Sequence, residues 1–309
     1  ARSVSGECGD IAFKGYPFRI GLSCSKVTVD DSGNGVSASF GQLRSAAQVY
    51  NPGHIVWELD SPAEIRTAHG LSISAEWQNL QSSLTTKLKG IDRTSLVIDG
   101  LKAKVVRQAD GSMSIDDLLG AQDAPAQEQP AEPEAAAKIP AFHVNGVTLA
   151  NARVVFDDRQ AGQTYTLERL NVETGPLANV IETPVSLSLG FGATSPEARG
   201  DFSMKGQLKI DLEQGRYGLR DFSAGLKGAI DTLQVQQFAL KLKGFSFDPQ
   251  GPIIDLNDLA LDAQGRMGAD SFRGTVAAPK LAIASDKASG DTVQAKVSLG
   301  DKEWLAAAL

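Results

Sequence analysis

The stretch DFSMKGQLKIDL, residues 201–212, carries an apolar side chain at almost every second position. Successive side chains of a β-strand point to opposite faces, so an apolar period of two gathers them on one face. The stretch therefore predicts a long strand with one apolar and one polar face. Its apolar residues are Phe202, Met204, Leu208, Ile210 and Leu212.

The same alternation recurs further along the chain, in FALKLK (238–243) and TVQAKVSL (292–299). Turn-forming stretches such as EQGR (213–216), DPQG (248–251) and AQGR (263–266) separate the apolar runs. Strands follow strands with no convincing amphipathic helix after residue 139, which predicts a mainly antiparallel meander. The predicted apolar face continues through Phe238, Leu240, Leu242, Val293, Val297 and Leu299.

A stretch rich in Ala, Gln, Glu and Pro, residues 121–138, divides the chain. It has too few large apolar residues to offset the entropy lost on ordering, so we predict a linker. This prediction separates an N-terminal β-rich module, residues 1–120, from a β-sheet domain at 139–309.

Two segments of the first module have helical features. SIDDLLG (114–120) predicts a short helix, because Ser114 can cap its start and Gly120 can end it. Residues 79–89 are ambiguous, since the four-residue spacing of their leucines also suits a short helix.

Charge and motif content favour neither nucleic-acid binding nor catalysis. The net charge is −7 and the pI is about 5.1, without a basic cluster that would suit a nucleic acid. His54, His69 and His143 have no second His or Cys at metal-ligand spacing, and common catalytic motifs are absent. We therefore expect no enzyme activity, no metal and no cofactor.

The acidic pair in FDDRQAG (156–162) is the best candidate for catalysis, and a turn explains it better. Asp157 and Asp158 end the apparent strand ARVVF, and Gly162 precedes the next strand. Neighbouring strand residues point to opposite faces, so two such carboxylates are poorly placed to share one substrate. We predict a hairpin here.

Cys8 and Cys24 are the only cysteines. From the residues alone they form either a disulfide, as expected in an oxidising compartment, or two reduced buried thiols. No run of about 18 apolar residues occurs, so we expect no membrane-spanning helix within these 309 residues.

Two segments of the chain, which follow each other in order, resemble the AsmA family of Gram-negative bacteria. KAKVVRQADGSMSIDDLLG (102–120) and IPAFHVNGVTLANARVVFDDRQAGQTYTLERLNVETG (139–175) match its order of strand, short helix, spacer and hairpin. The resemblance covers about 102–300. Residues 1–100, with GYPFRIGLSC (15–24), instead resemble a periplasmic domain family found mostly in alphaproteobacteria. In that family two cysteines recur at these places, which supports a disulfide between Cys8 and Cys24.

The AsmA resemblance implies long, curled antiparallel sheets with a hydrophobic groove. It also implies a periplasmic protein, held at the inner membrane by an anchor outside this stretch, that moves phospholipids toward the outer membrane. Binding to outer-membrane assembly factors is the alternative role. Alternation alone is equally typical of an apolar face packed as an ordinary core against a second layer.

Overall fold

The computed structural model describes residues 4–31, 35–67, 72–87, 90–107, 143–249, 254–284 and 287–308. These residues form β-strands and turns, and no helix occurs among them. None of them therefore provides a helix with the length and apolar character needed to cross a membrane. The predicted helix at 114–120 and linker at 121–138 lie outside the described residues.

Two compact units make up the chain. The first comprises residues 1–94, 98–142 and 154–163, and the second comprises 95–97, 143–153 and 164–309. The units divide strand β13 between them, whereas the sequence predicted a division at the linker. The predicted domain limits stay a prediction.

Most strands of the first unit form two antiparallel arrays. One array has the order β1–β4–β5–β8–β9–β12, and the other has the order β2–β3–β6–β7–β10. Their bounds are β1 (Val4–Cys8), β2 (Ala12–Lys14), β3 (Arg19–Cys24), β4 (Val27–Asp31), β5 (Val36–Phe40), β6 (Leu43–Gln48), β7 (Asn51–Leu59), β8 (Ala63–Thr67), β9 (Ser72–Glu76), β10 (Asn79–Lys87), β11 (Gly90–Asp99) and β12 (Lys102–Arg107).

The helical alternative is wrong for residues 79–87, while residues 88 and 89 lie outside the described residues. Residues 79–87 form β10, which pairs with β7 from Gln81 opposite Glu58 to Thr85 opposite His54. Pairing with a neighbouring strand overrides a weak helical spacing because it satisfies the backbone along the whole segment.

Trp77 is the largest buried side chain of the first unit. It is 9% exposed and lies between β9 and β10. Its indole Nε1 donates a hydrogen bond to the carbonyl oxygen of Leu59 at 2.6 Å. A buried indole needs such a partner for its N–H group, so the ring is fixed in orientation as well as packed.

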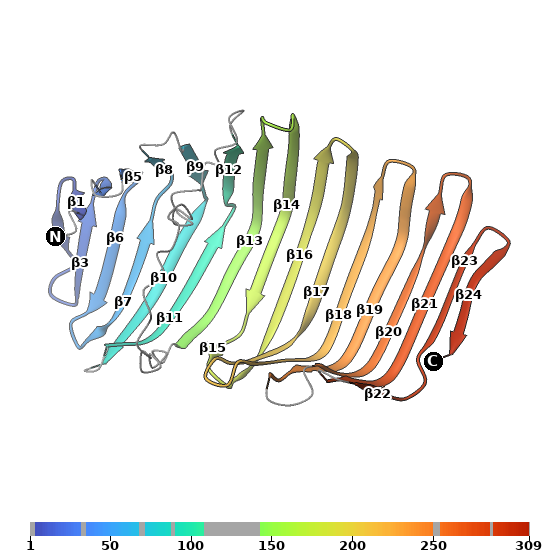
Figure 1. Ribbon diagram of the computed structural model, residues 1–309. Coiled ribbons are helices and arrows are strands. Elements are labelled where there is room, and N and C mark those ends of the chain that lie inside the picture. The colour runs from blue at the N-terminus through green and yellow to red at the C-terminus, as the bar shows by residue number, and fades with distance from the viewer. Residues whose placement is uncertain are drawn as a thin grey trace, which may run out of the picture. The chain divides into compact units, whose positions relative to one another are not determined.

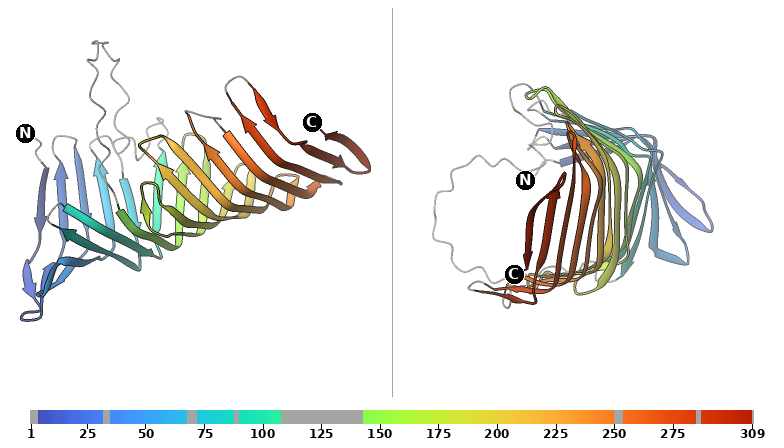
Figure 2. Two further views of the ribbon diagram at one scale, coloured as in Figure 1. Left: turned by 90° about the horizontal axis from the view of Figure 1, so that it is seen from below. Right: turned by 90° about the vertical axis from the view of Figure 1, so that its right-hand side faces the viewer.

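The second unit is an antiparallel meander, as the sequence predicted, and its sheet is curled and unclosed (Figures 1 and 2). From β16 to β21 each strand pairs with the next strand in sequence. The bounds are β13 (His143–Asp158), β14 (Gln163–Thr174), β15 (Leu177–Ala178), β16 (Glu182–Thr194), β17 (Glu197–Asp211), β18 (Arg216–Ile230), β19 (Leu233–Phe247), β20 (Ile254–Met267), β21 (Asp270–Ile283), β22 (Ala288–Gly290), β23 (Gln294–Leu299) and β24 (Lys302–Ala308).

In four neighbouring strands, β18 to β21, the alternation of apolar and polar residues is interrupted once. The interruptions lie opposite one another across the sheet. On regular β17, Met204 and Leu208 share a face, and they lie opposite Ala224 and Leu219 of β18. These two β18 residues are an odd number of positions apart, so β18 contains an extra residue between them. We call these interruptions together the bulge row; its members, two successive residues per strand, are Arg220–Asp221, Lys243–Gly244, Asn257–Asp258 and Pro279–Lys280.

The bulge row bends the strands without breaking the apolar face. β19 and β20 interrupt their alternation at the same place as β18, so Arg220, Gly244 and Asn257 stay directly opposite one another. Asp221 and Asp258 adopt positive φ angles of 47° and 49°, which accommodate the extra residue. Figure 1 shows these strands bending toward their lower ends.

Candidate functional site

Apolar side chains of the second unit face one another across the strands in continuous rows. The central row runs from β14 to β23 through Val172, Leu187, Met204, Ala224, Leu240, Leu261, Val276 and Ala295. The row beside it contains Leu189, Phe202, Leu226, Phe238, Ala263, Gly274 and Val297. Beyond the bulge row follow Leu208, Leu219, Phe245, Leu256 and Leu281. We call these three rows and their same-side neighbours the apolar face.

The structure brings most of the residues predicted for this face together. Phe202, Met204, Leu208, Phe238, Leu240 and Val297 lie in the three rows, while Ile210, Leu242 and Leu299 lie opposite Tyr217, Phe222 and Phe272. Leu212 and Val293 lie just beyond the ends of β17 and β23. The apolar residues of β16, β18 and β21 on this face were not predicted from the sequence, although the alternation within each of these strands is a usable signal.

No second layer buries the apolar face within the part of the chain that the structure describes. In an ordinary core most of these large side chains would be fully enclosed. Here Leu242, at 8% exposed, is the largest buried apolar side chain of the second unit among the described residues, and Val297 is 41% exposed. The buried apolar residues of both units are Cys24, Ala63, Trp77, Ala152, Leu242 and Ala278.

Two phenylalanine rings cover glycines directly opposite them on the apolar face. A Cβ on Gly200 would lie 2.5 Å from the Phe191 ring, and one on Gly265 would lie 2.6 Å from the Phe272 ring. In each pair the ring fills the space that a side chain on the glycine would occupy.

The predicted turn at AQGR (263–266) is wrong, because these residues lie inside β20. The glycine-containing stretch GFGAT (190–194) likewise lies within a strand, because it belongs to β16.

We expect Gly265→Val to destabilise the protein by roughly 1–3 kcal/mol, because the added side chain meets the Phe272 ring and the Gln234 backbone oxygen. Gly274→Val is the matched control, since a Cβ there meets nothing within 4 Å. Urea unfolding of both variants measures the difference. Equal destabilisation would contradict the role of the Phe272–Gly265 pair.

The opposite face of the second unit is polar. It carries ion pairs such as Arg169–Asp201 at 2.7 Å and Arg273–Asp262 at 3.4 Å. A shallow hollow of about 540 Å³ on this sheet is lined by Ser186, Ser203 and Ser223 and also by Leu187, Met204 and Ala224 of the central row. The structure thus shows an apolar face and a hollow whose lining mixes polar and apolar residues. The predicted apolar groove stays a prediction.

The acidic pair forms the predicted hairpin. β13 ends at Asp158, Gly162 has a φ of 65°, and β14 begins at Gln163. Asp158 accepts a hydrogen bond from the Ala161 backbone N–H at 3.0 Å and lies 3.4 Å from the Arg107 guanidinium.

Asp157 belongs to a separate ion pair. Lys104 Nζ is 3.1 Å from its carboxylate, and this hydrogen bond lowers the pKa of Asp157. Asp157 thus pairs with Lys104 and Asp158 with Arg107, as expected for carboxylates that stabilise a turn. Among the described residues, no three His, Cys, Asp or Glu side chains form a group that could hold a metal ion.

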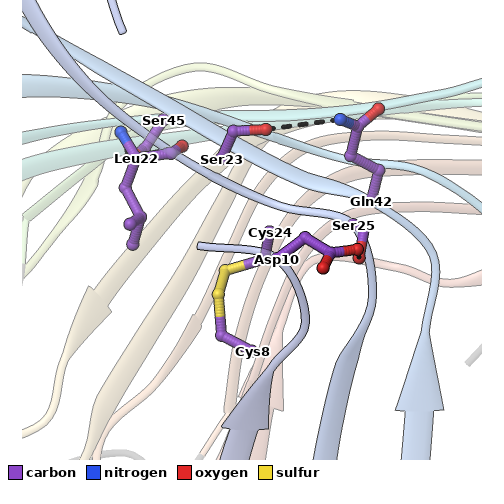
Figure 3. The surroundings of a disulfide bond; sticks show 8 residues. All are labelled: Cys8, Asp10, Leu22, Ser23, Cys24, Ser25, Gln42 and Ser45. Atoms are coloured by element: carbon purple, nitrogen blue, oxygen red, sulfur yellow. Dashed lines mark hydrogen bonds between the residues drawn. A yellow bond between two sulfur atoms is a disulfide. The ribbon is translucent and has the colours of Figure 1, made fainter. Parts of the chain in front are cut away.

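Cys8 and Cys24 form a disulfide that joins the two arrays of the first unit (Figure 3). Cys8 ends β1, which pairs with β4, whereas Cys24 ends β3, which pairs with β2 and β6. Ser25 Oγ donates to Asp10 at 3.0 Å beside it, and Cys24 is 2% exposed. The disulfide thus crosslinks the two arrays beside the Gly9 N–H, which donates a hydrogen bond to the Lys26 carbonyl oxygen at 2.9 Å.

The sequence from residue 1 to residue 267 matches a family described as an uncharacterized protein conserved in bacteria, DUF2125. The chain belongs to the DUF2125 family. The DUF2125 match includes both sides of Leu101, where the sequence resembled two different families. No curated protein and no solved structure matches the chain. The AsmA resemblance of this DUF2125 protein stays a prediction.

Proposed function

We propose that this DUF2125 protein is a non-enzymatic carrier that holds phospholipid acyl chains on its apolar face. One observation supports the proposal most: three rows of apolar side chains cross the second unit without a covering layer among the described residues. The resemblance to the AsmA family points to the same role. In this proposal the protein works in the periplasm between the inner and outer membranes.

The apolar face suits a long flexible chain better than a compact ligand. Neighbouring strands are about 4.8 Å apart, so the central row, from β14 to β23, extends for roughly 30 Å. Each methylene removed from water contributes about 0.8 kcal/mol, so an acyl chain gains on the order of 10 kcal/mol. Such binding needs no headgroup recognition, which agrees with a face that lacks ion pairs along its rows.

The disulfide supports the proposed compartment. Disulfides persist in oxidising environments such as the bacterial periplasm and are rare in the cytosol. Cys8 and Cys24 are both engaged, so the described residues include no free thiol.

The central pair Leu240 and Leu261 provides the test, since these residues lie directly opposite each other on β19 and β20. In Leu240→Gln/Leu261→Gln we expect at least tenfold weaker phospholipid binding, because two amides replace apolar contact with the acyl chain. Native mass spectrometry of the gently purified 309-residue chain measures the bound lipid.

Lys241→Gln is the matched control, because this exposed residue neighbours Leu240 on the opposite face. It should retain the lipid, and circular dichroism verifies that all variants fold. A lipid-free wild type, or equal lipid occupancy in the paired variant, would exclude the carrier role. Binding of an outer-membrane assembly factor by lipid-free protein would favour the interaction role instead.

A further inference from the structure

Three of the most exposed aromatic side chains among the described residues lie on two turns of the first unit, and Phe13, which is 77% exposed, lies on the adjoining strand β2. Tyr16 and Phe18, in the turn between β2 and β3, are 89% and 77% exposed, and Tyr50, in the turn between β6 and β7, is 79% exposed. Exposure of this degree means that these rings contribute little to packing within the fold. A cluster of exposed apolar side chains commonly marks a binding surface.

The two turns are neighbours. The Val49 backbone N–H donates a hydrogen bond to the Phe18 carbonyl oxygen at 3.2 Å. Arg19 lies opposite Gln48, and Ile20 lies opposite Ala47 on the paired strands β3 and β6. The right-hand view of Figure 2 shows two blue hairpin ends projecting side by side. We call these two turns, residues 15–18 and 49–50, the aromatic tip.

The charge around the aromatic tip is positive in an acidic protein. Residues 11–22 contain Lys14 and Arg19 and no acidic residue, whereas the whole chain has a net charge of −7. Both cationic side chains are exposed. Aromatic rings with nearby cations are typical of surfaces that enter the interfacial region of a bilayer, where rings occupy the headgroup level and cations attract anionic lipids.

We propose that the aromatic tip docks on an anionic lipid bilayer, with Tyr16, Phe18 and Tyr50 inserted at the headgroup level and Lys14 and Arg19 held against lipid phosphates. A bilayer fits better than a protein partner because the exposed rings lie on two projecting hairpin turns with the exposed cations Lys14 and Arg19 beside them. The inference does not depend on acyl-chain binding, since the tip and the apolar face belong to different units.

Flotation of the 309-residue chain with vesicles tests the docking. We expect binding to vesicles of phosphatidylglycerol and phosphatidylethanolamine, and at least tenfold weaker binding to phosphatidylcholine alone. The variant Tyr16→Ser/Phe18→Ser/Tyr50→Ser should bind the anionic vesicles roughly a hundredfold less tightly, because three inserted rings are lost. Added salt should weaken wild-type binding, because it screens the two cations.

Two controls separate the tip from the rest of the surface. Val180→Ser/Ile181→Ser removes apolar side chains that are 48% and 41% exposed but lie between β15 and β16, and it should float like the wild type. Leu240→Gln/Leu261→Gln should also float normally, so docking and acyl-chain carriage are measured independently.

Several results would overturn the proposal. They are absence of wild-type flotation, unchanged flotation of the tip variant, or an equal loss in the Val180→Ser/Ile181→Ser control. A dimer that forms without vesicle binding and dissociates in the tip variant would assign the tip to a second copy of the chain.

Discussion

Trp77→Ala is expected to destabilise the first unit by about 3–5 kcal/mol, the usual cost of truncating a large buried aromatic side chain. The indole is 9% exposed and donates to the Leu59 carbonyl oxygen, so its removal leaves both a cavity and an unpaired acceptor. Few other large side chains are buried in the described residues, and none of them can replace this contact. Chemical denaturation followed by circular dichroism measures the change.

Trp77→Phe separates packing from hydrogen bonding. It keeps most of the ring volume and loses only the N–H donor, so we expect a smaller loss of about 1–2 kcal/mol. Trp57→Ala, at a half-buried position on β7, is the second comparison. If Trp77→Ala proved no worse than Trp57→Ala, Trp77 would not be the centre of this unit.

Removal of the disulfide in Cys8→Ala/Cys24→Ala is expected to cost about 3 kcal/mol, as for other crosslinks that close a loop of this length. The two cysteines are 16 positions apart, so the crosslink restricts a substantial loop of the unfolded chain. Alanine is preferred to serine because the site of Cys24 is buried. Thermal unfolding with and without reductant measures the effect.

The reductant provides an internal control for this prediction. Wild-type protein should lose stability on reduction, while the double variant should be insensitive to reductant. A wild type that unfolds identically in both conditions would contradict a stabilising crosslink. Because the disulfide joins β1 to β3, its loss should affect the first unit and leave the second unit folded.

The strands of the second unit could be predicted because their signal is local. Each strand alternates apolar and polar residues on its own, as at Phe238, Leu240 and Leu242, and the antiparallel meander follows from strands joined in succession. The hairpin at Asp157 and Asp158 was predictable for the same reason, since a polar segment with a glycine lies between two alternating runs.

Features that depend on a neighbouring strand were missed. AQGR resembles a turn, but Gly265 lies in mid-strand because the Phe272 ring from β21 occupies the space above it. The leucines of β10 have helical spacing, yet pairing with β7 decides their conformation. The bulge row is visible in sequence only once strands are aligned, as two apolar residues separated by two polar ones, for example Leu256 and Leu259.

Because each strand of the second unit pairs with the next strand in sequence, evolution can lengthen or shorten the sheet by one hairpin at a time. Each strand from β16 to β21 depends only on the strands on either side, as in repeat proteins, so a hairpin can be added or lost without rearranging the others. The bulge row sets the condition for such changes. A new hairpin must interrupt its alternation at the position of the bulge row. Otherwise its apolar side chains beyond that row would point to the polar side of the sheet, and the apolar face would be interrupted.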